Sequence, residues 1–305
     1  MSCTKEHFGP KGLFGSFGAG IGAPLELAVE APGVECFQLH VPEEQDMTTA
    51  WAQRVKALIE PRQIKIARFV IGYSGLDGDQ YDSPQRVLET VGFGVQDHAK
   101  RQARLALTKR YIQFGYEQLG VKDFNAHLGH VDETNEFFAP MVESVQECCD
   151  IVSQWGGHYD VETGPESFDA LYAFIKKVNR PGIFRVNVDL ANIVLYHGLW
   201  EPITFLRQLL DAGVEIGGVH LKDAMPVTCQ PTMQQWNGEE VHPGNGMVNF
   251  PLLLKTLFEH GYRDAIVVER EVLGESGLQK VRKMAETLTW VYNLCRDIEN
   301  ACAAK

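Results

Sequence analysis

The chain has 305 residues, of which 45% are hydrophobic and 22% are charged, and its formal net charge is −12. This length can form one large domain with a full core or two domains of ordinary size, and the composition is that of a globular protein. Proteins that bind phosphodiester backbones usually present a basic face. The excess of 40 acidic over 28 basic residues therefore argues against a nucleic acid as partner.

The cysteines and the apolar runs indicate the cellular compartment in which the protein is expected. The seven cysteines are an odd number, and no two of them form a Cys-x-x-Cys pair. The sequence therefore indicates neither a disulfide framework nor a structural zinc site. The N-terminus has no apolar signal core, and no run approaches the roughly 18 apolar residues of a membrane span. We expect a reduced, cytoplasmic protein with no membrane partner.

In chain order, short β-like runs alternate with longer runs of helical periodicity. Strands are predicted at 12–17, 34–40, 63–72, 122–128, 157–162, 183–189, 215–221 and 264–269. Eight strand–helix units over about 300 residues have the size and rhythm of a (β/α)8 TIM barrel, so we predict a single α/β domain of this class over residues 1–305. A doubly wound open sheet is the alternative, because alternation alone does not prove that the sheet closes.

Two long segments interrupt this rhythm. Residues 73–119 predict a polar loop over 74–83 and then a largely uninterrupted helix to Leu119, and residues 223–247 are loop-like and rich in Pro, Gly, Gln and Trp. Both follow strands, so both are expected on the active-site face of a barrel, as a lid or a pocket wall. A last helix at about 281–302 is expected to close the barrel.

Four donor side chains stand at the ends of the last four predicted strands. They are Glu162, Asp189, His220 and Glu269. Neighbouring strand ends in a barrel are roughly 5 Å apart, so these side chains can converge on one ion. Three carboxylates and one imidazole suit Mn²⁺, Mg²⁺ or Co²⁺, and clustered carboxylates need a cation to offset their repulsion. The pattern predicts a metal-dependent enzyme.

The motifs around these donors resemble a known family. They are Val-Glu-Thr-Gly at 161–164, Asn-Val-Asp-Leu-Ala-Asn at 187–192, Val-His-Leu-Lys-Asp at 219–223, Gly-Glu-Glu-Val-His-Pro-Gly-Asn-Gly-Met-Val-Asn-Phe at 238–250 and Val-Val-Glu-Arg-Glu at 267–271. In this order they resemble the xylose isomerase-like TIM-barrel superfamily, in its sugar or sugar-phosphate isomerase/epimerase branch. The resemblance implies that the four donors hold the metal, with Mn²⁺ as first choice and Zn²⁺ as a further candidate.

The resemblance also implies a reaction. Family epimerases use two glutamates as acid and base, which match Glu162 and Glu269 and would move the α-proton of a sugar, keto-sugar or sugar phosphate through an enediolate. Glu271 competes with Glu269 as ligand, because alternation along a strand points both to one side. We choose Glu269 because it ends the apolar run.

Other residues are candidates for binding a small carbohydrate. His127 ends the fourth strand, where the family often has His-x-Gly, and Asn192 falls where relatives often have a His or Asn near the substrate. His40 ends the second strand. Lys222 follows His220 by two residues and could face the substrate, or it could pair with Asp223. Relatives often form dimers or tetramers, so a homo-oligomer is expected from the resemblance.

Three alternatives remain open. A lyase or dehydratase acting on a keto-sugar, an inosose or a 3-keto glycoside would use the same metal and bases. A catalytically inactive sugar-binding barrel belongs to a different class, although every proposed ligand is present. The endonuclease IV branch of the superfamily needs more histidine ligands and a DNA-binding face, which the net charge of −12 disfavours.

Overall fold

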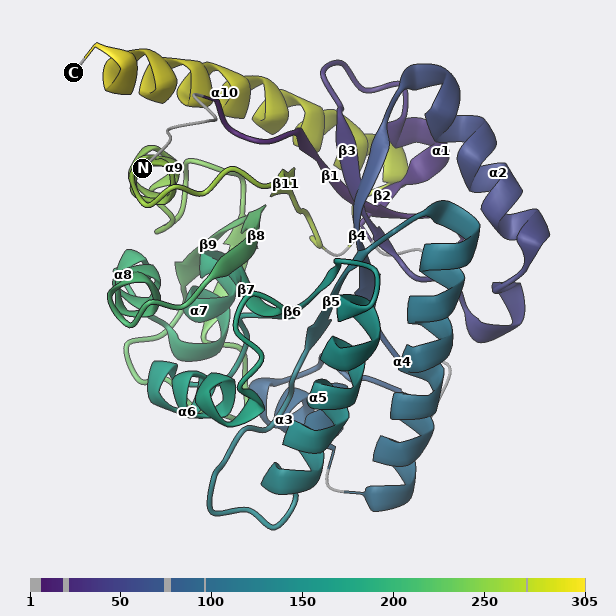
Figure 1. The fold of residues 1–305 in the computed structure, drawn as a ribbon. Helices are drawn as coiled ribbons and strands as arrows, with labels where there is room; N and C mark the ends of the chain where they lie inside the picture. Colours follow the sequence, from purple (N-terminus) through teal and green to yellow (C-terminus); the bar gives the residue numbers. More distant parts are fainter. Residues whose placement is uncertain (1–6, 19–21, 74–77, 96, 273, 305) are drawn as a thin grey trace.

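Eight parallel strands form a barrel, and helices surround it (Figure 1). This computed structural model describes residues 7–18, 22–73, 78–95, 97–272 and 274–304. The strands are β1 Lys11–Ser16, β3 Cys36–His40, β4 Lys65–Ile71, β5 Asp123–His127, β6 His158–Glu162, β7 Phe184–Asp189, β8 Ile216–Leu221 and β11 Ile266–Val268. Strand β11 pairs with both β8 and β1, so the barrel is closed. The predicted TIM barrel is confirmed, and the open-sheet alternative is wrong.

Helices follow the strands and pack around the outside of the barrel. They are α1 Leu25–Ala28, α2 Thr49–Ile59, α3 Pro84–Thr90, α4 His98–Leu119, α5 Phe138–Ser153, α6 Phe168–Val178, α7 Leu190–His197, α8 Ile203–Asp211, α9 Phe250–Glu259 and α10 Gly277–Ala303. Side-chain N-caps explain where several begin: Thr48, Ser83, Asp97, Ser167 and Asn249 each accept a backbone N–H of the first turn. Ser276 starts α10 with a capping box. No helix of the described chain is both long and apolar enough to cross a membrane.

The largely uninterrupted helix predicted after residue 83 ends at Leu119 as expected, but it is divided into two helices. A turn that includes the short 3-10 helix Gly92–Gly94 separates α3 from α4. The turn packs against the end of β5: the amide of Gly94 donates to the carbonyl of Leu128 at 2.7 Å, and a Cβ on Gly92 would lie 2.2 Å from the carbonyl oxygen of His127. The chain breaks here because only glycine permits this approach, together with the φ of +62° at Gly92. Part of the preceding loop, 74–77, lies outside the described residues.

Residues 223–247, predicted as a loop, contain a β-hairpin. Strands β9 Asp223–Pro226 and β10 Gly238–Val241 pair antiparallel. The carboxylate of Asp223 accepts backbone N–H groups of Gly244, Gly246 and Val248 at 2.8–3.0 Å, which ties the end of the segment back to its start. The segment is therefore an ordered structure that follows β8, on the side of the barrel where the strands end.

The interior of the barrel is polar near the start of its strands. Arg68 of β4 and Arg185 of β7 both pair with the fully buried Asp160 of β6, at 2.5 and 2.8 Å. A Cβ on Gly217 would lie 2.5 Å from Asp160, so that glycine makes room for the network. The apolar core lies instead between the strands and the surrounding helices.

Candidate metal centre

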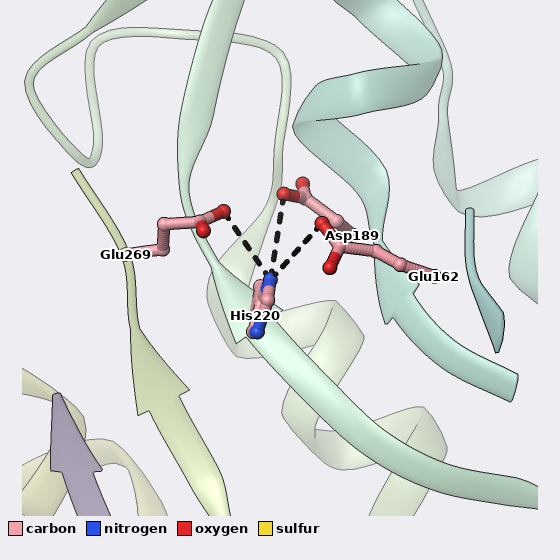
Figure 2. A group of neighbouring side chains, drawn as sticks. All are labelled: Glu162, Asp189, His220 and Glu269. Atoms are coloured by element: carbon pink, nitrogen blue, oxygen red, sulfur yellow. Dashed lines mark ion pairs between the residues drawn. The ribbon is translucent and has the colours of Figure 1, made fainter. Parts of the chain in front are cut away.

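The four predicted ligands meet at the carboxyl end of the barrel. Glu162 and Asp189 are the last residues of β6 and β7, His220 lies next to the last residue of β8, and Glu269 follows β11 directly. One ligand atom of each lies within 4.8 Å of the others, and all four residues are at most 4% exposed. In Figure 2, Glu269 approaches His220 from one side, and Glu162 and Asp189 approach it from the other.

The imidazole of His220 is the centre of this cluster. Its Nδ1 lies 3.3 Å from Glu162, 3.9 Å from Asp189 and 3.2 Å from Glu269. Its Nε2 lies 2.6 Å from Oε1 of Gln38, and the amide nitrogen of Gln38 is itself directed to another side chain. Nε2 therefore donates its proton to Gln38, and Nδ1 faces the carboxylates. This is the tautomer that a metal-ligating histidine adopts, with a partner on its other nitrogen.

Neighbouring amides hold two of the carboxylates. Glu162 accepts hydrogen bonds from Nδ2 of Asn125 at 2.9 Å and from Nδ2 of Asn192 at 3.2 Å. Oδ1 of Asp189 accepts the backbone N–H groups of Ala191 and Asn192, which makes Asp189 the N-cap of α7. Its other oxygen, Oδ2, is left to face the cluster.

Lys222 supplies a buried positive charge beside the ligands. Its Nζ lies 3.0 Å from Asp189, 2.7 Å from Glu269 and 2.8 Å from Glu271, and the residue is only 1% exposed. The alternative pairing of Lys222 with Asp223 is wrong, because that carboxylate caps the hairpin segment instead. The side chain of Glu271 is 49% exposed and lies outside the cluster of four, which contains Glu269.

The charges shift the ionisation of the cluster. Burial raises the pKa of Glu162, but His220 and His127 together outweigh burial and lower that pKa to about 2. In the same way, His220 and Lys222 hold the pKa of Glu269 well below its usual value against the effect of burial. Burial raises the pKa of Asp189 to about 7 in spite of Lys222. For His220, burial lowers the pKa, but Glu269 and Glu162 outweigh it and raise the pKa well above its usual range.

These donors fit a divalent cation. Nδ1 of His220 and Oδ2 of Asp189 are both buried and form no hydrogen bond of good geometry within the described chain. Their neighbours are charged groups: carboxylates face Nδ1, and Nζ of Lys222 lies 3.0 Å from Oδ2. Carboxylate oxygens with one imidazole nitrogen are ligands for hard and borderline divalent ions. A cation at this point would take the place of the proton that the carboxylates stabilise on His220.

The structure places the predicted substrate contacts at different distances from the cluster. Nε2 of His127 lies 3.6 Å from Oε1 of Glu162, and Asn192 donates to that same oxygen. The ring of His40 lies against Gly72, and its Nδ1 is 2.8 Å from a backbone carbonyl. His127 and Asn192 therefore join the cluster, whereas the contacts of His40 are with neighbouring backbone.

Aromatic side chains stand around this end of the barrel. The ring of Trp236, from the turn of the β9–β10 hairpin, lies 5.0 Å from the ring of Tyr196, and the ring of Tyr81 lies 6.3 Å from His127. Asn237 anchors the hairpin by donating to the carbonyl of Tyr196 at 2.7 Å. One long segment thus places an aromatic ring beside Tyr196 of α7, and the other places one beside His127; their role as a pocket wall stays a prediction.

Sequence reasoning missed several residues that support the ligands. Gln38, Asn125 and Asn187 are fully buried, and each contacts a ligand. Each stands two residues before a strand-end polar residue. Since residues two apart share a face of a strand, this polar spacing within apolar runs was a usable signal. The buried Glu166, in the loop after β6, had no such signal.

Comparison with known proteins agrees with this architecture. The family model described as xylose isomerase-like TIM barrel matches residues 25–294. The chain belongs to the xylose isomerase-like TIM barrel family. A solved member, the xylose isomerase domain protein from Planctomyces limnophilus, is 30% identical, with a TM-score of 0.86 over 96% of this chain and 99% of that one.

More distant structures share the barrel of this family. D-psicose 3-epimerase from Clostridium cellulolyticum H10, solved with D-tagatose, is 15% identical with a TM-score of 0.65, covering 94% of this chain and 99% of that one. The IOLI protein, solved with a zinc atom, is 17% identical with a TM-score of 0.66, covering 93% and 98%. At these identities the likeness shows the fold alone. No curated protein sequence matches the chain.

Proposed function

We propose that this protein is a divalent-metal-dependent isomerase or epimerase of a sugar, keto-sugar or sugar phosphate, which acts through an enediolate intermediate. The observation that carries the proposal is the buried cluster of Glu162, Asp189, His220 and Glu269, in which two glutamates approach one imidazole from opposite sides. Membership of the xylose isomerase-like family and the epimerase among the similar folds support it. Mn²⁺ is our first choice of metal, followed by Mg²⁺, Co²⁺ and Zn²⁺.

The four ligands would hold the cation, which when bound would polarise a carbonyl and its neighbouring hydroxyl and stabilise the negative charge left when the α-proton departs. Glu162 and Glu269 lie 3.3 and 3.2 Å from Nδ1 of His220, so they flank the place where the substrate oxygens would sit. One takes the α-proton, and the other returns a proton on the opposite face. Asp189 and His220 then serve only as anchors.

Neighbouring side chains keep the two bases in place. Asn125 and Asn192 donate to Glu162, so that carboxylate cannot rotate away from the substrate. The ammonium group of Lys222 is held by carboxylates and buried, so we propose that it acts on the substrate indirectly, by orienting Glu269. His127 and Asn192 are the proposed hydroxyl contacts nearest to Glu162, and His40 is a further one.

Proton NMR in D₂O tests the reaction. Ketoses, keto-sugars, inososes and their phosphates would each be incubated with Mn²⁺-loaded protein, and spectra would be recorded after the metal is removed. We expect one of them to gain deuterium at the carbon beside the carbonyl as its epimer or isomer forms. Product without deuterium would point to a hydride shift, and an unsaturated product would point to a lyase.

A control separates the enzyme from an inactive barrel. The protein with Glu162→Gln should take up the metal but give no deuterium exchange. Metal content, measured by mass spectrometry after purification and after loading, is read on the same samples. A wild-type protein that binds no divalent ion and converts none of the sugars would contradict the proposal and favour a binding protein.

A further inference from the structure

The loop between β6 and α6 buries a carboxylate that the proposed acid/base pair does not use. Glu166 is only 4% exposed, and its Oε1 accepts the N–H of Gly164 at 3.1 Å. Its Oε2 is buried and has no hydrogen bond. Burial raises the pKa of Glu166 to about 7. A buried carboxylate whose hydrogen bonds come only from the backbone of its own loop costs stability, so its presence calls for a function outside the loop.

His127 has the complementary need. Its Nδ1 is buried without a hydrogen bond, and its Nε2 lies 3.6 Å from Oε1 of Glu162, which is too long for a direct bond. The side chain is 19% exposed, so the ring reaches the mouth of the barrel. In a neutral imidazole one nitrogen donates and the other accepts, and the partner of one nitrogen decides the role of the other.

Gly164 brings these two groups together. Gly164 does not have a positive φ, so its backbone does not require glycine. Glycine is needed here because a side chain would occupy the space between its neighbours. A Cβ at Gly164 would lie 3.3 Å from Oε2 of Glu166 and 3.4 Å from Nδ1 of His127. Both unbonded atoms therefore border the volume that a side chain would fill. His127 also lowers the pKa of Glu166, in part against the larger effect of burial.

We propose that Glu166 is a positioning residue for His127: its Oε2 accepts a hydrogen bond from Nδ1, directly or through one water molecule. Nε2 then keeps its lone pair and accepts a hydrogen bond from a hydroxyl group of the sugar. The hydroxyl group has a single proton, so it donates to Nε2 and not to Oε1 of Glu162, which lies 3.6 Å from Nε2. His127, oriented by Glu166, thus selects substrates with a hydroxyl group next to the reacting carbon. Only this last step rests on the proposed function.

Nitrogen-15 NMR of histidine-labelled, Mg²⁺-loaded protein tests the contact without any substrate. The ring signals of His127 are assigned with His127→Asn and read at pH 8.5, where Glu166 is ionised. We expect the Nδ1–H tautomer in the wild type and in Glu166→Gln, which keeps an acceptor oxygen. Glu166→Leu should give the Nε2–H tautomer or a mixture. Asp169→Leu, which removes an exposed carboxylate three residues away, should leave the spectrum unchanged.

Kinetics and metal affinity complete the test. With the substrate that shows exchange, Glu166→Leu should lower kcat/KM by roughly tenfold to a hundredfold and Glu166→Gln by less, while the affinity for Mn²⁺ stays that of the wild type. The proposal is overturned if wild-type His127 is the Nε2–H tautomer, or if Glu166→Leu leaves its signals unchanged. If no sugar is converted, the proposed function fails, but the tautomer result still decides the role of Glu166.

Discussion

Replacing Gln38 by leucine should weaken metal binding through the tautomer of His220. Oε1 of Gln38 lies 2.6 Å from Nε2 of His220 and accepts its proton. Once it is gone, the polar neighbour of Nε2 that remains among the described residues is Nδ2 of Asn187 at 3.2 Å, which is a donor. A donor at Nε2 favours a proton on Nδ1, and this is the atom that would bind the cation.

The expected size of the effect follows from the burial of the contact. Gln38 and His220 are at most 1% exposed, so no solvent can replace the lost acceptor. Outer partners of metal-bound histidines typically contribute about 10- to 100-fold in affinity. This corresponds to roughly 1.4–2.7 kcal/mol of binding free energy. Leucine has nearly the volume of glutamine, so the fold should be retained.

Isothermal titration with Mn²⁺ at pH 8 measures the effect, and near-ultraviolet circular dichroism checks the fold. Gln38→Glu is the matched control, because its carboxylate still accepts the Nε2 proton and should keep an affinity within about threefold of the wild type. A folded Gln38→Leu protein that binds Mn²⁺ as tightly as the wild type would refute the tautomer argument.

Four further substitutions test the site and the fold. Glu162→Gln and Glu269→Gln should each abolish deuterium exchange at the substrate while keeping much of the Mn²⁺ affinity. The amide oxygen of glutamine still faces the cation, but it cannot take the proton. If both variants remained active, the division of roles among the four ligands would be overturned. Arg68→Met should lower the free energy of unfolding in urea by about 3 kcal/mol, since it leaves the fully buried Asp160 with Arg185 as its one remaining arginine partner among the described residues, and a loss below about 1 kcal/mol would contradict this. Glu275→Gln should lower Tm by about 2 °C at pH 7, because hydrogen bonds from Arg270 lower the pKa of Glu275 to about 2. That stabilisation is complete above about pH 4.3, the pKa of a glutamate in the unfolded chain, and is lost as the pH falls toward 2. The difference in Tm between the wild type and Glu275→Gln should therefore shrink over this range. A constant difference in scanning calorimetry would argue against the ion pair.

Local sequence patterns were enough to predict the barrel and the strand ends at which the four candidate ligands stand. Each strand appeared as an apolar run whose periodicity reports burial, and each run ended within two residues of the observed strand. The errors came where one segment meets another. The break at Gly92 depends on the backbone of β5, and the hairpin depends on pairing between residues such as Asp223 and Val241. No local window contains those contacts.

The sequence by itself determined which donor residues stand at the strand ends, because the side-chain period of a strand is local. Only the tertiary structure decided how they meet. A shift of register between β7 and β8 sets Asp189 opposite His220, and Gln38, 182 residues away, orients that imidazole. Lys222 contacts Glu269 and other carboxylates, not the neighbour in sequence predicted as its alternative partner. Register, strand closure and side-chain rotamers depend on the packing of the whole barrel, and packing joins residues that are far apart in the chain.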